Sequence, residues 1–385
     1  MKSHLTNWNL DNKCILLRAD LNVPLKNGAI LDDTRLRALQ PTLDYILSRG
    51  GSIVLATHIG RPKDNEPKLS TQHLLPWFKK HNYTINWQPN IDTVIKPAQG
   101  TITLLENLRF YPGEKNNDAT FAQKLAQWGD LYVNDAFGTM HRNDASITRV
   151  PKLFDIHKRT VGFLVEKELK TLHQLRSNPQ QPCVLLLGGS KASDKIPVIA
   201  GLLDKIQTLV LLPAIVFTFM RALNKPVGKS LVDEASIPNC KDILARAQQQ
   251  NITIIMPVDF QVAQGTIDGP LSIVSADNFP DDAVGISIGP RTIARIQQVI
   301  TPAKTIFFNG IPGFIDRKET LDGVRKLFDI LAHAQGETII SGGDSIAAVT
   351  MFDLAERMDY LTTGGGATLT YLSGQSFPGL EVFKK

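Results

Sequence analysis

The stretch Arg18-Ala19-Asp20-Leu21-Asn22-Val23-Pro24 directly follows the apolar run of residues 14–17. This run is short, continuous and rich in Ile and Leu, which is typical of a strand buried on both faces of a parallel sheet. Residues 53–56 form a second such run, which ends in Thr57-His58-Ile59-Gly60-Arg61-Pro62. Polar and charged side chains thus follow the carboxyl end of each predicted strand, which is where ligands bind in parallel α/β sheets.

Similar apolar runs recur along the chain, with helical patterns between them. They comprise residues 15–19, 53–57, 102–105 and 131–134 in the first half, and residues 184–187, 209–212, 252–256, 306–309 and 338–341 in the second. Two groups of βα units predict an α/β protein with two doubly wound, Rossmann-like domains, each built on a parallel sheet.

The pattern between the two groups predicts a connecting helix. Apolar residues recur at helical spacing over residues 161–175, and Ser177-Asn178-Pro179-Gln180-Gln181-Pro182 then breaks the pattern. We expect an N-terminal domain over residues 1–160, a connecting helix and hinge over residues 161–182, and a C-terminal domain over residues 183–366. Residues 367–385 are expected to form a C-terminal segment that packs back toward the N-terminal domain.

The composition is that of an ordinary globular enzyme. The chain has 385 residues, 43% of them hydrophobic and 21% charged, and 42 basic against 37 acidic residues give a formal charge of +5. No basic block suggests a nucleic-acid partner, and no apolar run of about 18 residues suggests a membrane span. Cys14, Cys183 and Cys240 lie far apart, and no signal peptide is evident, so we expect a cytoplasmic protein without a disulfide framework.

Basic and titratable residues gather near the predicted strand ends of the first half. They are Arg35, His58, Arg61, Arg109 and Arg142. Arginine offers a planar fork that matches phosphate and carboxylate oxygens. Taken singly, each arginine is equally well explained as a solvated surface charge, and His58 as a core histidine. Taken together, at one edge of one sheet, they indicate an anion site, in which Asp20 and Asn22 would hold hydroxyls or orient the arginines.

Glycine-rich turns follow three predicted strands of the second half. They are Gly188-Gly189-Ser190-Lys191-Ala192-Ser193-Asp194-Lys195, Ser341-Gly342-Gly343-Asp344-Ser345 and Thr363-Gly364-Gly365-Gly366-Ala367-Thr368. Glycines allow the backbone to approach phosphates, and Asp344 offers an oxygen ligand for Mg²⁺. The Walker loop is excluded, because Leu223 stands where that loop needs its first glycine before Gly228-Lys229-Ser230. One such turn alone would be weak support, but three of them with Lys and Asp attached favour a nucleotide site.

These motifs, in this order and through nearly the whole chain, resemble those of the phosphoglycerate kinase family. The first-half motifs include Glu106-Asn107-Leu108-Arg109-Phe110 and Asp135-Ala136-Phe137-Gly138-Thr139-Met140-His141-Arg142. The resemblance implies that 3-phosphoglycerate or 1,3-bisphosphoglycerate is bound by Asp20, Asn22, Arg35, His58, Arg61, Arg109 and Arg142. It implies nucleotide binding by Gly188, Gly189, Lys191, Lys195, Asp316, Gly342, Gly343, Asp344 and Ser345, with Asp344 on Mg²⁺.

The reaction that the resemblance implies is phosphoryl transfer in glycolysis and gluconeogenesis. 1,3-Bisphosphoglycerate and ADP would give 3-phosphoglycerate and ATP, reversibly and without a covalent enzyme intermediate. Arg35, Lys195 and the backbone of Gly364, Gly365 and Gly366 would neutralise the transferring group. The substrates would bind on opposite domains, which would close to exclude water. We expect a monomer, with neither nucleic acid nor membrane as a partner.

The chain departs from the family pattern around the nucleoside. The family usually has Asn-Gly-Pro, then a Gly and Phe-Glu for the ribose, where this chain has residues 309–316 ending in Asp316. Ser345 replaces a usual Thr, and residues 211–216 lack a usual run of glycines. Two alternatives therefore stay open: a protein of the same fold with altered nucleotide use, and a non-catalytic binding or scaffold protein. We expect weaker discrimination among bases than among phosphate numbers.

Overall fold

The structure is a computed structural model that describes residues 4–315 and 317–384. The chain forms two compact units. Unit 1 runs to Lys170 and takes in the segment from Ser376 onward, and unit 2 comprises Thr171–Gln375. The division falls within helix α6 (Phe163–Ser177) and again shortly after helix α13 (Gly366–Leu372). In the part of the chain described, no helix is long and apolar enough to cross a membrane.

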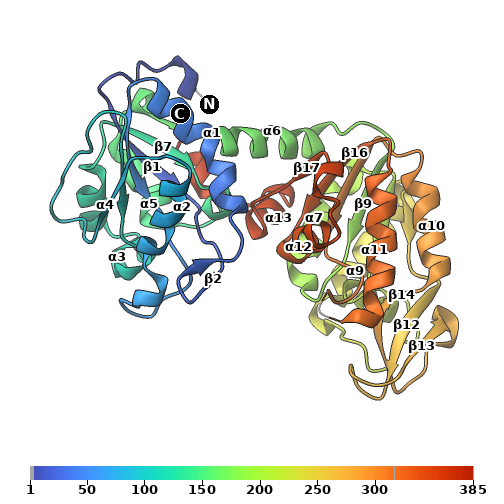
Figure 1. The fold of residues 1–385 in the computed structure, drawn as a ribbon. Coiled ribbons are helices and arrows are strands. Elements are labelled where there is room, and N and C mark those ends of the chain that lie inside the picture. Colours follow the sequence, from blue (N-terminus) through green and yellow to red (C-terminus); the bar gives the residue numbers. More distant parts are fainter. Residues whose placement is uncertain (1–3, 316, 385) are drawn as a thin grey trace. The chain divides into compact units, whose positions relative to one another are not determined.

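Unit 1 is built on a six-stranded parallel sheet (Figure 1). Its strands are β1 (Cys14–Ala19), β4 (Ser52–Ala56), β5 (Ile85–Gln88), β6 (Ile102–Leu105), β7 (Leu131–Asp135) and β8 (Arg159–Val161), in the order β5-β6-β4-β1-β7-β8. Ile15 of β1 pairs with Ile53 on one side and with Leu131 on the other. The chain thus continues on opposite sides of β1, which creates a switch point where the loops after β1, β4 and β7 meet.

Helices and one hairpin complete unit 1. They are α1 (Thr34–Ser48), α2 (Leu75–Lys80), α3 (Pro112–Lys115), α4 (Ala119–Ala126), α5 (Ala145–Thr148), α14 (Pro378–Glu381) and the hairpin of β2 (Leu25–Lys26) with β3 (Ala29–Ile30). The C-terminal segment contacts the turn after β7. The Gly379 N–H donates to the Met140 carbonyl at 2.8 Å, and the rings of Phe377 and Phe137 lie 5.5 Å apart.

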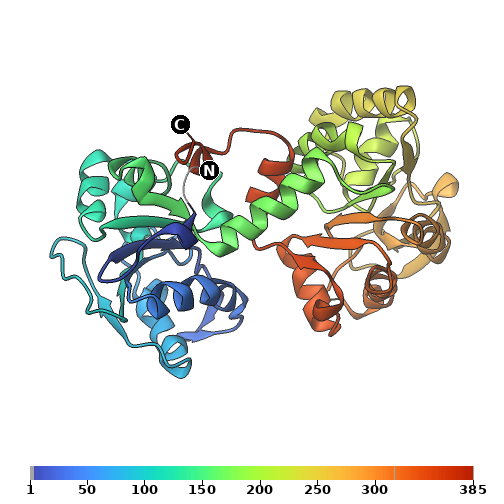
Figure 2. The same cartoon turned by 90° about the horizontal axis from the view of Figure 1, so that it is seen from above.

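Unit 2 contains a second six-stranded parallel sheet. Its strands are β9 (Cys183–Leu187), β10 (Thr208–Leu211), β11 (Thr253–Ile255), β15 (Thr305–Asn309), β16 (Glu337–Ser341) and β17 (Tyr360–Leu361), in the order β11-β10-β9-β15-β16-β17. One helix group is α7 (Ala192–Leu202), α8 (Ile215–Ala222), α9 (Ile237–Gln249) and α13; the other is α10 (Pro290–Ile300), α11 (Lys318–Ala332) and α12 (Gly343–Met351). Figure 2 shows the two groups on opposite faces of the sheet.

The predicted α/β class and its parallel strands are confirmed, because each predicted apolar run overlaps a strand of one of the two parallel sheets, to within a residue at either end. The predicted connecting helix is α6. The sequence did not predict the antiparallel sheet of β12 (Asp259–Gln264), β13 (Leu271–Ser275) and β14 (Ala283–Ile288). Strand β13 is half-exposed, and the exposed fraction of Ile273 reaches 55%. A strand of this kind lacks the continuous buried run by which the parallel strands are recognised.

Candidate active site

The loop after β1 holds a buried ion pair at the carboxyl edge of the unit 1 sheet. Asp20 follows β1 directly, and its carboxylate accepts a hydrogen bond from the Arg35 guanidinium in the first turn of α1. Burial raises the pKa of Asp20, but the charges of Arg35 and the neighbouring cations outweigh it and hold the pKa below its usual value. Gly138 lies against this pair and leaves no room for a Cβ. The ionised Asp20 therefore fixes the position of Arg35.

Behind this pair lies a buried network that positions His58. The exposed fraction of Arg18 in β1 is 1%, and its Nε donates to Ser146 Oγ at 2.7 Å. Its Nη2 lies 3.3 Å from His58 Nδ1 and 3.8 Å from Glu114 Oε1. Because a guanidinium only donates, Nδ1 must accept, and the histidine proton then sits on Nε2. The sequence did not lead us to predict Arg18 and Glu114 as residues of the site. The charge of Arg18 within the apolar strand β1 was a signal that could have identified it.

His58 is an uncharged hydrogen-bond donor in this setting. Burial and the nearby charges of Arg18, Arg109 and Arg142 hold its pKa well below the usual value, although Asp20 acts in the opposite direction. The ring is therefore neutral at physiological pH, with Nε2–H left for a partner.

Asn22 connects the loops after β1 and β4. Its Oδ1 accepts the Gly60 N–H at 2.7 Å, and the preceding Leu21 N–H donates to Thr57 Oγ1 at 3.0 Å. The first of these bonds uses the Asn22 oxygen and leaves the NH₂ group of Asn22 for another acceptor.

Two arginines reach the same edge from loops farther along the chain. Arg109 follows β6, and its Nη1 donates to the Gly60 carbonyl at 2.5 Å. Burial and the charge of Arg142 lower the pKa of Arg109 to about 10. The charge of Arg142 is therefore close enough to Arg109 to act on its pKa. In the described ranges, the Arg142 side chain has no hydrogen bond and no ion pair.

Arg61 is exposed and directly follows Gly60. Among the described residues its guanidinium has no bonded partner, and it is not one of the charges that shift the pKa of His58 or Arg109. The structure thus gathers Asp20, Asn22, Arg35, His58, Arg109 and Arg142, and places Arg61 on a more exposed part of the same loop. Arg61 and Arg142, which have no bonded partner among the described residues, fit an anionic ligand.

In unit 2, a buried lysine lies beside the first glycine-rich turn. Gly189 has φ +90°, and a Cβ there would lie 3.1 Å from Lys195 Nζ. The exposed fraction of Lys195 is 9%, and within the described part of the chain its ammonium has no hydrogen bond and no ion pair. Burial lowers its pKa, which Asp194 and Asp344 partly counteract. A largely buried lysine whose ammonium has no partner among the described residues fits an anion that arrives with a ligand.

The other residues predicted around this lysine lie on neighbouring turns. The Gly188 N–H donates to the Asn309 carbonyl at 2.8 Å. Lys191, just before α7, is exposed. Gly342 has φ +98° at the start of α12, and Ser345 Oγ accepts the Gly310 N–H at 3.1 Å. Gly343 and Asp344 are exposed at the same helix start. The turn therefore presents a carboxylate whose charge reaches Lys195.

Whether Mg²⁺ could bind at Asp344 depends on the other oxygen ligands nearby. No group of three or more His, Cys, Asp or Glu side chains in the described residues could hold a metal ion. Mg²⁺ prefers about six oxygen ligands, often one or two carboxylates with phosphates and water. Asp344 alone therefore fits Mg²⁺ only as one ligand of an ion that phosphate oxygens also hold.

The third glycine-rich turn opens α13, which packs against α7. Gly364 is buried, Gly365 has φ +52°, and Gly366 begins the helix. A Cβ on Gly365 or Gly366 would have no neighbour within 4 Å. The backbone of this turn is thus open to an approaching group.

The segment expected to flank the nucleoside has an unusual backbone at Ala214. Leu211, Leu212, Ile215 and Val216 are fully buried, so their bulk lies in the protein interior. Ala214 has φ 72° and ψ −67°, a region that residues with a Cβ rarely adopt. Asp316, the residue expected at the ribose, lies outside the described residues.

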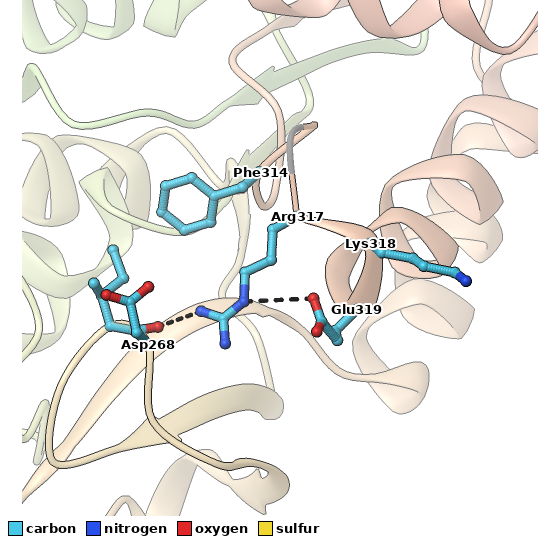
Figure 3. A pocket seen from close by; sticks show the side chains of 6 residues that line it. Asp268, Phe314, Arg317, Lys318 and Glu319 are labelled. Carbon is cyan, nitrogen blue, oxygen red and sulfur yellow. Dashed lines mark hydrogen bonds and ion pairs between the residues drawn. The ribbon is translucent and has the colours of Figure 1, made fainter.

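A cavity of about 520 Å³, which the sequence did not predict, lies in unit 2 between the turn after β12 and the start of α11 (Figure 3). It is lined by Ile267, Asp268, Phe314, Arg317, Lys318 and Glu319. Arg317 closes one side, because its guanidinium donates to the Ile267 carbonyl in the turn between β12 and β13, and its Nε lies 3.7 Å from Glu319 Oε2. The partly exposed Phe314 ring forms an apolar wall (Figure 3).

Comparison with known proteins identifies the family. The sequence model of the phosphoglycerate kinase family matches residues 5–375. A phosphoglycerate kinase of Trichodesmium erythraeum is 40% identical over 98% of this chain and 96% of its own length. The chain belongs to the phosphoglycerate kinase family. A phosphoglycerate kinase of Dictyoglomus turgidum is 37% identical over 99% of this chain and 98% of its own length.

Solved phosphoglycerate kinase structures share the fold. That of Coxiella burnetii has a TM-score of 0.89 and 32% identity, and covers 99% of this chain and 98% of its own. The predicted family and activity are confirmed: the activity is that of a phosphoglycerate kinase, a phosphotransferase with a carboxyl group as acceptor. ATP and ADP are the co-substrates that this family implies.

Proposed function

We propose that unit 1 holds 3-phosphoglycerate or 1,3-bisphosphoglycerate, that unit 2 holds ADP or ATP, and that the phosphoryl group passes directly between them. The observation that carries this assignment is the pair Arg109 and Arg142, which repel each other at the edge of the unit 1 sheet beside a neutral His58. A phosphate that carries two negative charges relieves that repulsion, and an uncharged ligand would not.

The residues of unit 1 divide between binding and transfer. Arg61, Arg109 and Arg142 bind the phosphate that is not transferred. The Nε2–H of His58 and the NH₂ group of Asn22 donate to the carboxylate and hydroxyl oxygens of the glycerate. Asp20 holds Arg35, which is placed to neutralise charge on the transferring group.

The residues of unit 2 hold the phosphates of the nucleotide. Gly188, Gly189, Gly342, Gly343 and Ser345 shape turns that the phosphates approach, and Lys191 and Lys195 supply positive charge. The backbone of Gly364, Gly365 and Gly366 donates to the transferring phosphoryl, and Asp316 would hold the ribose. Asp344 would hold Mg²⁺ together with the phosphates of the nucleotide, and the ion would neutralise part of their charge.

Phosphoryl transfer then requires only that the two substrates are aligned and that the charge on the transferring group is neutralised. The carboxylate of 3-phosphoglycerate is itself the nucleophile, so the chain supplies no covalent intermediate. Arg35 acts on the transferring group from unit 1 and Lys195 from unit 2. We propose that the chain works as a cytoplasmic monomer.

Isothermal titration tests the assignment of one ligand to each unit. Arg142→Ala should weaken 3-phosphoglycerate binding about tenfold or more, because it removes a charge-assisted contact, while MgADP binding stays unchanged. Lys195→Ala should do the reverse. Lys13→Ala, at the opposite end of β1, is the matched control for a lost positive charge. Equal loss of both ligands in Arg142→Ala would refute the assignment.

A second candidate, a kinase of this family with relaxed base use, is favoured by residues 211–216, which lack the run of glycines that the family usually has beside the base. An apolar pocket distinguishes similar shapes poorly, so bases should be discriminated less than phosphate numbers. The ratio kcat/KM for ATP, GTP and a pyrimidine triphosphate measures this. We expect ATP to be preferred over GTP by less than about a hundredfold, that is ~2.7 kcal/mol; a larger ratio would exclude relaxed base use.

A further inference from the structure

Asn107 is a fully buried amide between β6 and Arg109, and its exposed fraction is 0%. Its side-chain NH₂ group donates to the Ile59 carbonyl at 2.8 Å and to the Leu69 carbonyl at 2.9 Å. Its Oδ1 accepts the Arg109 N–H at 3.0 Å. Both donors of this amide and its acceptor are therefore used, and the reverse orientation would place the oxygen against two carbonyl oxygens.

The two carbonyl groups lie at the two ends of the loop that follows β4. This loop, residues 60–69, carries Arg61. Glu106 holds the chain just beyond the loop, because its carboxylate accepts the Ser70 hydroxyl at 2.7 Å and the Thr71 N–H at 2.8 Å. A single buried amide thus ties both ends of the loop to the same point of the chain after β6. Loss of either bond would leave a carbonyl group without that partner.

The start of the same loop binds the Arg109 side chain. The Gly60 carbonyl accepts Arg109 Nη1 at 2.5 Å, and the Gly60 N–H donates to Asn22 Oδ1 at 2.7 Å. Gly60 has φ +64°, and a Cβ there would lie 2.9 Å from the Leu69 side chain. Asn107 therefore holds Arg109 at two points. It bonds the main-chain N–H directly, and it fixes the loop whose next carbonyl binds the guanidinium.

We propose that Asn107 is a positioning residue of the phosphate site: its amide fixes the loop of residues 60–69 and the Arg109 main chain, and so directs the Arg109 guanidinium toward the phosphate group that is not transferred. This rests on the proposed function of unit 1. Charge-assisted contacts of arginine depend on geometry, so a displacement of about 1 Å removes much of their effect. Asn107 does not touch the ligand, since its polar groups are all used within the chain.

The substitution Asn107→Ser separates the bonds to the loop from the bond to the Arg109 main chain. A serine hydroxyl is a good acceptor at the start of a helical turn, so it keeps the bond from the Arg109 N–H. It has one donor on a shorter side chain and cannot bond both carbonyl groups. Asn107→Ser therefore releases the loop of residues 60–69 and leaves the turn after β6 capped.

A purely structural role for Asn107 predicts a different outcome. Asn107→Ser would then lower the melting temperature and leave the ligand affinity of the folded chain unchanged. Cys14→Ala is the matched control for such a loss. Cys14 is buried at the amino end of β1, at the opposite edge of the sheet, and its Sγ donates to the Trp128 carbonyl at 3.2 Å.

The experiment is a double-mutant cycle, measured by isothermal titration of the full chain with 3-phosphoglycerate and MgADP. Asn107→Ser should weaken 3-phosphoglycerate binding about tenfold and leave MgADP binding unchanged. Together with Arg109→Ala, the same substitution should change 3-phosphoglycerate binding less than about twofold, because the group that Asn107 positions is gone. Cys14→Ala should lower the melting temperature without a change in either affinity.

The Nε–H resonance of Arg109 in ¹⁵N-labelled chain without ligand gives the second readout, and it is assigned by its loss in Arg109→Ala. Asn107→Ser should shift or broaden this resonance, and Cys14→Ala should leave it in place. If Asn107→Ser fails to fold, Asn107→Gln, which moves the amide by one methylene, carries the same cycle.

An equal loss of 3-phosphoglycerate binding with and without Arg109 would overturn the proposal. An unchanged affinity or an unchanged Arg109 resonance in Asn107→Ser would overturn it as well. If the parent chain does not bind 3-phosphoglycerate, the proposed function of unit 1 fails, while the Arg109 resonance still tests the positioning by Asn107.

Discussion

At the scale of single residues, Arg35 is held in place before any ligand arrives. Its ion pair with Asp20 leaves about a third of the Arg35 side chain exposed and almost none of the Asp20 side chain. A guanidinium has five N–H donors, so one bond to Asp20 leaves others for a ligand. A donor fixed in advance costs no reorganisation when charge develops on the transferring group.

Arg35→Ala should therefore lower kcat about a hundredfold or more, with KM for 3-phosphoglycerate changed only a few-fold, because the lost contact forms mainly in the transition state. Steady-state kinetics measure both constants. Arg35→Lys keeps the charge but loses the fork and should recover part of the rate. A kcat within a few-fold of the parent in Arg35→Ala would remove Arg35 from the transfer step.

The residues of the candidate site were predictable where a polar side chain follows an apolar strand. Asp20, His58 and Arg109 are of this kind, since the carboxyl ends of parallel strands meet at one edge. Arg18 and Glu114 were not predicted. They are separated by 96 positions in the sequence, and only the tertiary fold brings them within 3.8 Å. Local patterns contain no information on such a contact.

At the scale of elements, the start of α6 depends on one buried carboxyl. Asp135 ends β7, and its oxygens accept the Thr42 hydroxyl at 2.6 Å and the Val165 N–H at 3.0 Å. Gly162 lies directly against it and leaves no space for a Cβ. Burial raises the pKa of Asp135 to about 7, although these hydrogen bonds lower it.

The sign of this shift gives a pH dependence. The pKa of Asp135 is higher in the folded than in the unfolded chain, so its contribution to stability is complete below the unfolded value of 3.8 and is lost as pH rises through about 7. Asp135→Asn should remove this part of the slope, which amounts to a few kcal/mol at most. Denaturant unfolding from pH 4 to pH 8 measures it. An unchanged slope in Asp135→Asn would show that Asp135 is not the titrating group.

The turn before α8 contains local strain at Ala214. Its φ of 72° and ψ of −67° match the γ-turn that is rare for residues with a Cβ. Ala214→Gly should stabilise the chain by about 1 kcal/mol, because glycine adopts this conformation freely. Ala245→Gly, at an exposed position inside α9, should instead destabilise it by about 1 kcal/mol. Denaturant unfolding compares the two, and a loss of stability in Ala214→Gly would contradict strain at this turn.

The elements differ in how far sequence could predict them. Buried strands such as β1 and β9 are continuous apolar runs and were predicted. Strand β17 has two residues, and β5 at the sheet edge is only partly buried, so neither has a distinct pattern. The antiparallel β12–β14 sheet, whose strand β13 is also only partly buried, was missed, and with it the cavity beside Phe314.

At the scale of the whole molecule, the two units have separate parallel sheets and separate apolar cores. The chain leaves unit 1 along α6, forms unit 2, and returns so that its last segment packs on unit 1. Phe383 is almost fully buried there, with its ring 6.5 Å from that of Tyr132. The proposed division of labour follows this division of the chain, with one substrate assigned to each unit.

The most direct test is the rate of ATP consumption by the purified chain in a coupled assay with Mg²⁺, with and without 3-phosphoglycerate. We expect ADP to form only when 3-phosphoglycerate is present, in a molar ratio of one to one with 1,3-bisphosphoglycerate. Binding of both substrates without transfer would contradict the phosphoryl-transfer function and favour a scaffold role for this chain.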